Sequence, residues 1–329
     1  MFKKSRSKLK FFDSDFKQSS SLNVFLSFLL DWLMIIFLVI GFSFINRIQG
    51  FHREFDLNDP TIQFTHVNHE RVPVHLLIIL AIVIPVILIV FTSQFLLKSK
   101  ADTHLALLGL ALSLTMALVI TVSVKVTVGR PRPDMLARCQ PSPQAISNMT
   151  SRLGKSNSSI CTAPVNSKEF QDGFRSFPSG HSSTAWSGLG YLAIYLAGKL
   201  NLLRNRIHSI KLWIPVTPLL GATLIAVSRT MDYRHHWQDV LVGSLIGLIT
   251  AWFSYRLYYP SLAFSHPHQP YPQSSSPSTI DKSNINDHQS SASHQSLQQM
   301  PNSAMSELPQ INPTGVVNSG LTEESFKNV

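Results

Sequence analysis

The sequence predicts an all-α integral membrane protein, a bundle of six transmembrane helices followed by a disordered C-terminal tail. Apolar residues make up 44% of the 329 positions and charged residues only 14%, whereas soluble domains carry roughly 25% charged residues. The apolar residues are concentrated in six runs that approach the about 20 helical residues needed to cross a bilayer core. The last part of the chain, 259–329, is rich in Ser, Gln, Asn, Pro and His and has too few apolar residues to stabilise a fold.

The six apolar runs give the predicted spans in chain order. They lie near 24–45, 74–97, 104–124, 183–199, 212–227 and 240–257. The first run follows a basic leader, 1–22, and is too long for the apolar core of a signal peptide. The last three runs are shorter and rich in Gly and Ala, a composition that lets helices pack closely inside a bundle. Residues 23–258 therefore form one predicted six-span domain.

Basic residues near the ends of the spans predict the orientation in the membrane. Lys and Arg are frequent in the leader, in the loop after the second span and in the loop after the fourth span. Because successive spans alternate, these three segments share one side, and that side and both termini are predicted to be cytosolic. Segments 46–73, 125–182 and 228–239 then face the lumen or the cell exterior. The candidate membranes are those of the vacuole, of the endoplasmic reticulum or Golgi, and of the cell surface.

The long outer loop contains features that suit this orientation. Two glycosylation sequons make Asn148 and Asn157 candidate modification sites. The same loop contains Cys139 and Cys161, the two cysteines of the chain, whose pairing is permitted by the oxidising environment outside the cytosol. A Ser- and Asn-rich insert at about 142–160 is interpreted as a glycosylated spacer.

Three short segments on the predicted outer face carry most of the chemistry-bearing side chains. They are Lys125–Asp134 after the third span, Phe177–Thr184 before the fourth, and Ser228–Asp239 between the fifth and sixth. Each segment joins a loop to a helix end, so a helical bundle brings all three to the same depth. We therefore expect the three segments to converge on one site.

Cations in these segments predict a phosphate-binding site. Lys125, Arg132 and Arg229 are unfavourable close to the apolar phase unless an anion lies between them. Arginine offers forked donors to phosphate oxygens, whereas lysine acts as a point charge. Ser179 and Gly180 come at the start of the fourth helix and add a hydroxyl and a backbone amide, as in other anion-binding helix ends.

Other polar residues near these segments receive structural interpretations. Two cations at span ends are interpreted as anchors that extend to the membrane interface: Arg130 and Arg138. Three carboxylates are interpreted as solvated loop residues: Asp134, Asp172 and Asp232. Three histidines at helix ends are interpreted as capping or packing residues: His75, His104 and His236.

Two histidines and one aspartate predict nucleophilic and acid–base chemistry. His235 and Asp239 share one helix face if the sixth helix begins at His235. A carboxylate that accepts a hydrogen bond from one imidazole nitrogen leaves the other nitrogen free as a nucleophile. His181, from another segment, is then placed to act as a general acid. A metal site on these three residues is disfavoured because the nearby cations repel a divalent ion, so we expect no metal and no cofactor.

The three segments resemble the signatures of the type 2 phosphatidic acid phosphatase superfamily of membrane lipid phosphate phosphatases. The patterns K-x6-RP, PSGH and SR-x5-H-x3-D occur complete and in order, in Lys125–Pro133, Pro178–His181 and Ser228–Asp239. The stretches GRPRPDMLARCQP and FDLNDPTIQFTHVNHERVP are similar to the fungal diacylglycerol pyrophosphate and phosphatidate phosphatase branch. The resemblance covers roughly residues 25 to 258.

This resemblance implies a six-helix bundle whose site faces away from the cytosol and needs no magnesium. It implies that His235 attacks phosphorus to form a phosphohistidine, that Asp239 orients His235, and that His181 protonates the leaving oxygen. The implied phosphate-binding residues are Lys125, Arg132, Ser179, Gly180 and Arg229. The implied substrates are diacylglycerol pyrophosphate and phosphatidate, with lysophosphatidate as a further candidate. The implied partners are the lipid phosphate and membrane lipid. A nucleic acid is not expected, because the Lys and Arg residues are dispersed or in short clusters.

Alternatives to this function differ in class. A vanadate-dependent haloperoxidase shares the signatures on a soluble fold, which the six predicted spans disfavour. A catalytically silent lipid-binding member of the family would lack a catalytic histidine, whereas His181 and His235 are both present. A polyprenyl pyrophosphate or sphingoid-base phosphate phosphatase stays open, because the signatures contact the phosphate and not the lipid.

Overall fold

The computed structural model describes residues 26–150, 155–202, 209–264 and 267–271, and the regular structure within them is helical, as predicted. The predicted leader, 1–22, and most of the predicted tail lie outside the described residues. Apolar side chains are exposed to the surroundings along the first helix, for example Leu30 (79% exposed) and Phe37 (68% exposed). Such a surface suits lipid and not water, and the chain is a multi-pass membrane protein.

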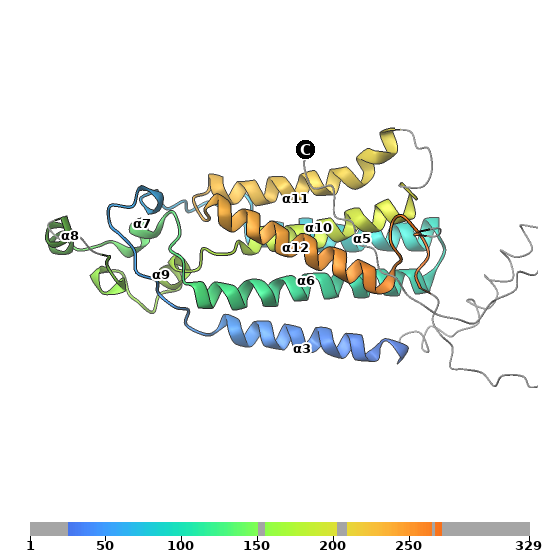
Figure 1. Ribbon diagram of the computed structural model, residues 1–329, viewed down its shortest axis with the longest axis horizontal. Coiled ribbons are helices and arrows are strands. Elements are labelled where there is room, and N and C mark those ends of the chain that lie inside the picture. The colour runs from blue at the N-terminus through green and yellow to red at the C-terminus, as the bar shows by residue number, and fades with distance from the viewer. Residues whose placement is uncertain (1–25, 151–154, 203–208, 265–266, 272–329) are drawn as a thin grey trace, which may run out of the picture. The chain divides into compact units, whose positions relative to one another are not determined.

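The long helices follow one another in the predicted order (Figure 1). They are α3 (Leu29–Asn46), the α4, η2, α5 and η3 series (Val74–Ile78, Ile79–Val83, Ile84–Phe91 and Thr92–Leu96), α6 (Lys100–Val128), α10 (Gly180–Lys199), α11 (Trp213–Met231) and α12 (Trp237–Tyr258). Within the described residues, five of these helical segments are long and apolar enough to cross a membrane. The exception is α10, whose Ser, Thr and Gly residues lower its hydropathy.

The position of α10 explains its composition. It packs against α6, α11 and α12, so most of its side chains contact protein instead of lipid. A Cβ atom added to Gly243 of α12 would lie 2.5 Å from the Ser179 backbone oxygen, and one added to Gly247 would lie 2.4 Å from that of Ser183. Only glycine at these two positions permits such a close approach of α12 to the first turn of α10.

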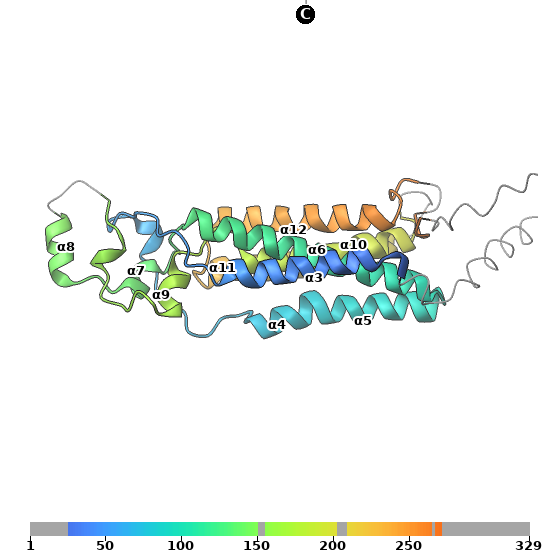
Figure 2. The ribbon, with the colours of Figure 1, turned by 90° about the horizontal axis from the view of Figure 1, so that it is seen from below.

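The second span contains π-helical turns on either side of α5. Pro85 lacks a backbone N–H, so the regular hydrogen-bond series of the helix is interrupted at this point. The backbone of Ala81, in η2, lies against Gly188 of α10, where a Cβ atom would come within 1.9 Å of the Ala81 oxygen. Figure 2 shows α4 and α5 running along the bundle at the side opposite α12.

The third and fourth helices extend beyond their predicted spans toward the outer loops. α6 continues to Val128, so Lys125 lies on the helix and not after it. The helix ends at Gly129, whose φ of 58° is in the left-handed region that favours glycine. α10 begins at Gly180 with Ser179 as its N-cap residue. Both helices therefore present their ends to the same group of loops.

The outer loops have an apolar core of their own. Buried Phe55, Met135, Phe170 and Phe174 form its centre, and the short helices α7 (Met135–Cys139), α8 (Pro143–Thr150) and α9 (Lys168–Gly173) lie at this end of the molecule (Figure 2). A disulfide joins Cys139 to Cys161, with Cα atoms 4.7 Å apart. Ser156, from the insert interpreted as a spacer, exchanges two backbone hydrogen bonds with Phe55, so this part of the insert belongs to the packed loops.

A buried polar cluster lies at the end of the bundle away from the outer loops, and we call it the far-end cluster. It consists of Asp102 from α6, Tyr195 and Lys199 from α10, and Tyr259 directly after α12. The Asp102 carboxylate accepts hydrogen bonds from both tyrosine hydroxyls, each 2.8 Å away, and pairs with the Lys199 ammonium. Tyr259 is fully buried, so the helical domain includes residues after α12.

Candidate active site

The three predicted segments meet at one end of the bundle. The Lys125 ammonium, on the last turn of α6, donates to the Arg175 and Pro178 carbonyl oxygens over 2.8 and 2.7 Å. The Ser179 backbone N–H donates to the Asp239 carbonyl oxygen over 2.9 Å. The end of α6, the start of α10 and the start of α12 are thus in direct contact, and the expected convergence is observed.

His235 lies in the turn between α11 and α12 and is only 4% exposed. Its Nδ1 atom is 2.6 Å from the Ser176 carbonyl oxygen. A carbonyl oxygen only accepts hydrogen bonds, so Nδ1 carries the hydrogen and Nε2 carries the free lone pair. Burial lowers the pKa of His235 well below 6.5, and the nearby Arg132 and Lys125 lower it further against the opposing effect of Asp239. The ring is therefore neutral at physiological pH.

Asp239 supports this arrangement through several donors. Its carboxylate accepts a hydrogen bond from the Ser176 hydroxyl and pairs with the Arg130 guanidinium at 2.7 Å. It also accepts from the backbone N–H of His236, the N-cap residue of α12, over 3.1 Å. The interpretation of His236 as a capping residue is confirmed, whereas the interpretation of Arg130 as an interfacial anchor is wrong.

The contact between His235 and Asp239 differs from the one expected. α12 begins at Trp237, so His235 precedes the helix and the two residues do not share a helix face. The distance from His235 Nδ1 to Asp239 Oδ2 is 3.8 Å, too long for a hydrogen bond. Ser176 connects them, because its hydroxyl donates to Asp239 while its carbonyl oxygen accepts from His235. Sequence spacing gave no sign of this residue.

The first turn of α10 presents donors beside an open space. His181 Nε2 is 3.1 Å from the Val72 carbonyl oxygen, which also accepts from Arg229 over 2.9 Å. A Cβ atom added to Gly180 would meet no atom within 4 Å, so the helix start is not covered at this point. The buried Ser179 hydroxyl accepts a hydrogen bond from Ser182. A helix N-terminus with an accessible glycine suits an anion.

Arg132 is fixed by a residue that was interpreted as a solvated carboxylate. Its Nε donates to the Asp172 carbonyl oxygen and its Nη2 to the Asp172 carboxylate, each over 2.7 Å. The Asp172 side chain is 43% exposed, so the burial that raises its pKa is only partial; the neighbouring Arg132 and Arg138 outweigh this effect and lower the pKa overall. Asp172 therefore stays ionised and determines the direction of the Arg132 side chain.

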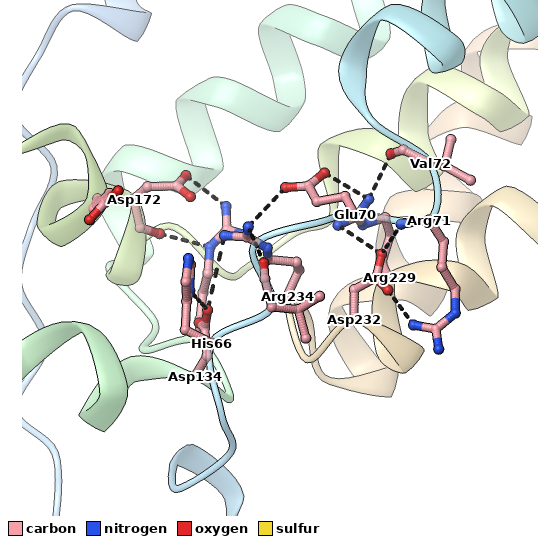
Figure 3. A network of polar contacts seen from close by, with 12 residues as sticks. His66, Glu70, Arg71, Val72, Asp134, Asp172, Arg229, Asp232 and Arg234 are labelled. Carbon is pink, nitrogen blue, oxygen red and sulfur yellow. Dashed lines mark hydrogen bonds and ion pairs between the residues drawn. The ribbon is translucent and has the colours of Figure 1, made fainter.

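Two further carboxylates belong to a buried network, so their interpretation as solvated loop residues is wrong (Figure 3). Asp134 and Asp232 are both 0% exposed. Asp134 Oδ2 lies 2.7 Å from His66 Nδ1 and 2.9 Å from Arg138 Nε. Because Arg138 is itself only 7% exposed, it is not an interfacial anchor. Sequence spacing does not reveal burial that arises from tertiary contacts.

The segment before the second span contributes the remaining residues of the network. Arg71 pairs with Asp232 through its guanidinium, and its backbone N–H donates to the same carboxylate over 2.9 Å. Glu70 lies between Arg229 and Arg234 (Figure 3). No role for Glu70, Arg71 or Arg234 was predicted from the sequence, although ionisable groups beside a spanning segment are a sign of function.

The described part of the chain does not bring together a set of metal ligands. No group of three or more His, Cys, Asp and Glu side chains is placed there to bind one ion. His181 and His235 each have a backbone carbonyl as partner. The donors that converge are instead N–H and ammonium groups, which match the oxygens of an anion.

Comparison with known proteins agrees with this geometry. A family model described as the PAP2 superfamily matches residues 106–262, a range that includes all three converging segments. A probable diacylglycerol pyrophosphate phosphatase 1 from Schizosaccharomyces pombe is 40% identical over 212 residues, which cover 64% of this chain and 74% of the relative. Diacylglycerol pyrophosphate phosphatase 1 from Saccharomyces cerevisiae is 36% identical over 73% of this chain and 82% of the relative.

A plant relative is similar over a comparable length. Lipid phosphate phosphatase 2 from Arabidopsis thaliana is 35% identical over 70% of this chain and 77% of its own length. No solved structure matches the chain. Since the fungal and plant relatives are each covered over more than two thirds of their length, the chain belongs to the PAP2 superfamily.

Proposed function

We propose that this protein is a membrane lipid phosphate phosphatase that hydrolyses diacylglycerol pyrophosphate and phosphatidate through a phosphohistidine, without magnesium. Its family and its named relatives identify it as a phosphatase with a lipid substrate. One observation carries the mechanism: a buried, neutral His235 with a free Nε2 lies close to Lys125 and Arg132 of the first segment. The finer substrate choice rests on the similarity to the fungal relatives.

The first half-reaction transfers the terminal phosphoryl group to His235. The Nε2 lone pair attacks phosphorus, an N–P bond forms, and the bond from phosphorus to the leaving oxygen breaks. The Ser176 carbonyl stabilises the proton on Nδ1 while positive charge develops on the ring. His181, in its protonated form, gives its proton to the leaving oxygen. Burial, Arg229 and Arg132 lower the pKa of His181 to about 3 when no anion is bound. A bound phosphate dianion opposes this shift and favours the protonated form, because opposite charges attract.

The second half-reaction regenerates the enzyme. His181, now neutral, accepts a proton from water as the water oxygen attacks phosphorus and the N–P bond breaks. Inorganic phosphate leaves, and both histidines return to their starting states. Lys125, Arg132 and Arg229 stabilise the charge on the phosphoryl oxygens in both steps, a contribution that is commonly about 3–4 kcal/mol for one such donor.

A substrate panel with excess chelator tests the chemistry, the lipid class and the metal requirement together. The panel contains diacylglycerol pyrophosphate, phosphatidate, lysophosphatidate, a polyprenyl pyrophosphate and a sphingoid-base phosphate. We expect wild-type protein in detergent micelles to release phosphate fastest from the first two, and His235→Ala to release none at a normal protein level. Full activity of that variant would refute the assignment of the nucleophile. Strict dependence on added magnesium would refute the metal-free mechanism.

The proposed orientation places the site in the lumen or outside the cell and both termini in the cytosol. Asn157 is exposed in the packed outer loops, so its sequon is accessible there. The side chain of Asn148 lies outside the described residues. We expect glycan on at least one of the two sequons in a eukaryotic host, seen as a mobility change on deglycosylation. If neither sequon is modified and a protease added to the cytosolic side cleaves the outer loop, the orientation is the reverse of the proposed one.

A further inference from the structure

The segment from His66 to Val72 lies across the donors assigned to the substrate. The Val72 carbonyl oxygen accepts hydrogen bonds from His181 and from Arg229. In the proposed reaction, His181 faces the leaving oxygen and Arg229 a phosphoryl oxygen, both of which are acceptors. The segment therefore already supplies acceptor oxygens where the substrate would supply them.

Glu70 supplies a negative charge where the phosphate of the substrate would supply one. Its Oε2 atom is 3.1 Å from Arg229 Nη1, and its Oε1 atom is 3.1 Å from Arg234 Nη2. One carboxylate thus contacts two guanidinium groups through separate oxygens, as two oxygens of a phosphate would (Figure 3). Arg229 is 1% exposed and Arg234 is 8% exposed, so water screens the charge of neither guanidinium effectively.

The cations nevertheless retain unused donors. The buried Nε atoms of Arg229 and Arg234 have no hydrogen-bond partner in the described part of the chain. Lys125 contacts two carbonyl oxygens and so has no full negative charge as its hydrogen-bond partner. Buried donors without acceptors are unfavourable. The site with Glu70 in place is therefore still short of negative charge and of acceptors.

We propose that Glu70 is a resident anion of the phosphate site, which the phosphate of the substrate displaces from Arg229 and Arg234 during binding. This proposal rests on the proposed function and adds the residue that sets the affinity for the anionic headgroup. Glu70 competes with the substrate phosphate for the two arginines and so weakens its binding. It competes equally with inorganic phosphate, so its return to the arginines favours release of the product.

A purely structural role for Glu70 makes the opposite prediction. If Glu70 stays in place and only positions the two arginines, its removal disorders their side chains and weakens anion binding. If phosphate displaces Glu70, its removal eliminates a competitor and strengthens anion binding. The sign of the change in phosphate affinity therefore distinguishes the two roles.

The test uses the full-length protein in detergent micelles with chelator, and inorganic phosphate as the probe. The dissociation constant for phosphate is measured by calorimetry in the wild type, in Glu70→Gln and in a matched control, Glu54→Gln. Glu54 is exposed on the same outer segment, and its replacement removes an equal charge; the ion pairs of Arg229 and Arg234 do not include it. We expect binding to become about tenfold tighter in Glu70→Gln, equivalent to about 1.4 kcal/mol, and to stay within about twofold in the control.

A second variant covers the case in which Glu70→Gln does not fold. Glu70→Asp keeps the charge but is shorter by one methylene, so it cannot contact both arginines at once, and we expect binding tighter than in the wild type. Phosphate affinity that is unchanged or weaker in the folded Glu70 variants, or no phosphate binding by any variant, overturns the proposal. A wild-type protein that releases no phosphate from any lipid overturns the proposed function instead, while the affinity comparison still decides the role of Glu70.

Discussion

The far-end cluster and the candidate active site occupy opposite ends of the same three helices, α6, α10 and α12, and both bury charged side chains. At the far end, Asp102 and Lys199 neutralise each other, and the Lys199 ammonium also lies over the Tyr195 and Tyr259 rings at 4.9 and 4.7 Å. At the candidate site, two arginines share the Glu70 carboxylate.

This difference separates a structural cluster from a functional one. Each charged group of the far-end cluster has an oppositely charged or hydrogen-bonding partner within the protein, so the cluster needs no ligand. The site keeps buried guanidinium donors without acceptors among the described residues, and its lysine has only carbonyl oxygens as hydrogen-bond partners. Since such a surplus of positive charge is unfavourable without an anion, we expect a bound phosphate to complete the site.

The largest expected effect comes from removing the lysine of the site. Lys125→Met should lower kcat/KM for phosphatidate by about 100- to 1,000-fold, the loss typical for a donor that stabilises charge in the transition state. Because the Arg175 and Pro178 carbonyl oxygens lose this donor but no carboxylate loses its cation, the loss of stability should be about 1–3 kcal/mol. The measurements are steady-state kinetics and thermal unfolding in detergent. A kcat/KM within tenfold of the wild type would contradict the role assigned to Lys125.

The matching substitution at the far end should affect stability instead of catalysis. Lys199→Met leaves the Asp102 carboxylate buried without its cation, which typically costs about 3–5 kcal/mol. The remaining folded protein should keep kcat/KM within about threefold of the wild type. A double variant, Asp102→Asn with Lys199→Met, should recover part of the lost stability because no charge remains unpaired. A large loss of kcat/KM at unchanged stability would show that the two ends are not separable.

Glycine substitutions sharpen the comparison by moving the helices themselves. Gly243→Ala places a Cβ atom 2.5 Å from the Ser179 backbone oxygen, so the start of α10 must move away from α12. We expect about a tenfold loss of kcat/KM and about 1–3 kcal/mol of destabilisation. The control is Gly190→Ala in the same helix pair, whose Cβ would lie an ordinary 3.7 Å from Ala251 Cβ. Equal activity of the two variants would exclude a positioning role for this contact.

The smallest expected effect concerns pH. Burial lowers the pKa of His235 below 6.5, so its neutral, nucleophilic form persists as the pH falls through 6.5 and is lost only at lower pH. From pH 7 to pH 6, the neutral fraction of an ordinary histidine falls about threefold, whereas the neutral fraction of His235 should hardly change. The check is kcat/KM against pH, corrected for ionisation of the lipid phosphate measured separately. A loss of kcat/KM through a protonation step at pH 6.5 or above, absent in the substrate, would contradict the neutral resting state of His235. Protonation of the general acid His181 has the opposite sign and raises kcat/KM.

The helical architecture was predictable because apolar runs of membrane length occur in few other folds. The helix ends were less predictable, since backbone hydrogen bonding continues past the apolar residues. α6 extends through Lys125 to Val128 and stops only at Gly129 with its positive φ. Residues 183–199 were predicted as a span, but α10 is enclosed by protein and is not among the five described helices that are long and apolar enough to cross a membrane.

The convergence of the segments that carry Lys125, His181 and His235 was predictable, because each of these segments joins a loop to a helix end. Ser176 was missed because it acts through a backbone oxygen, and Glu70 was missed because its partners are far away in sequence. Asp134 was misinterpreted since its burial results from contacts with His66 and Arg138. Tertiary contacts of this kind leave no periodic pattern in a single sequence.

Stabilisation by inorganic phosphate tests most directly whether the site is an incomplete cationic cluster and the far end a complete one. The melting temperature of the full-length protein is measured in chelator buffer with increasing phosphate, for the wild type, Lys125→Met and Lys199→Met. We predict a rise in melting temperature for the wild type and for Lys199→Met, and no rise for Lys125→Met. No stabilisation of the wild type, or equal stabilisation of both variants, would contradict the account.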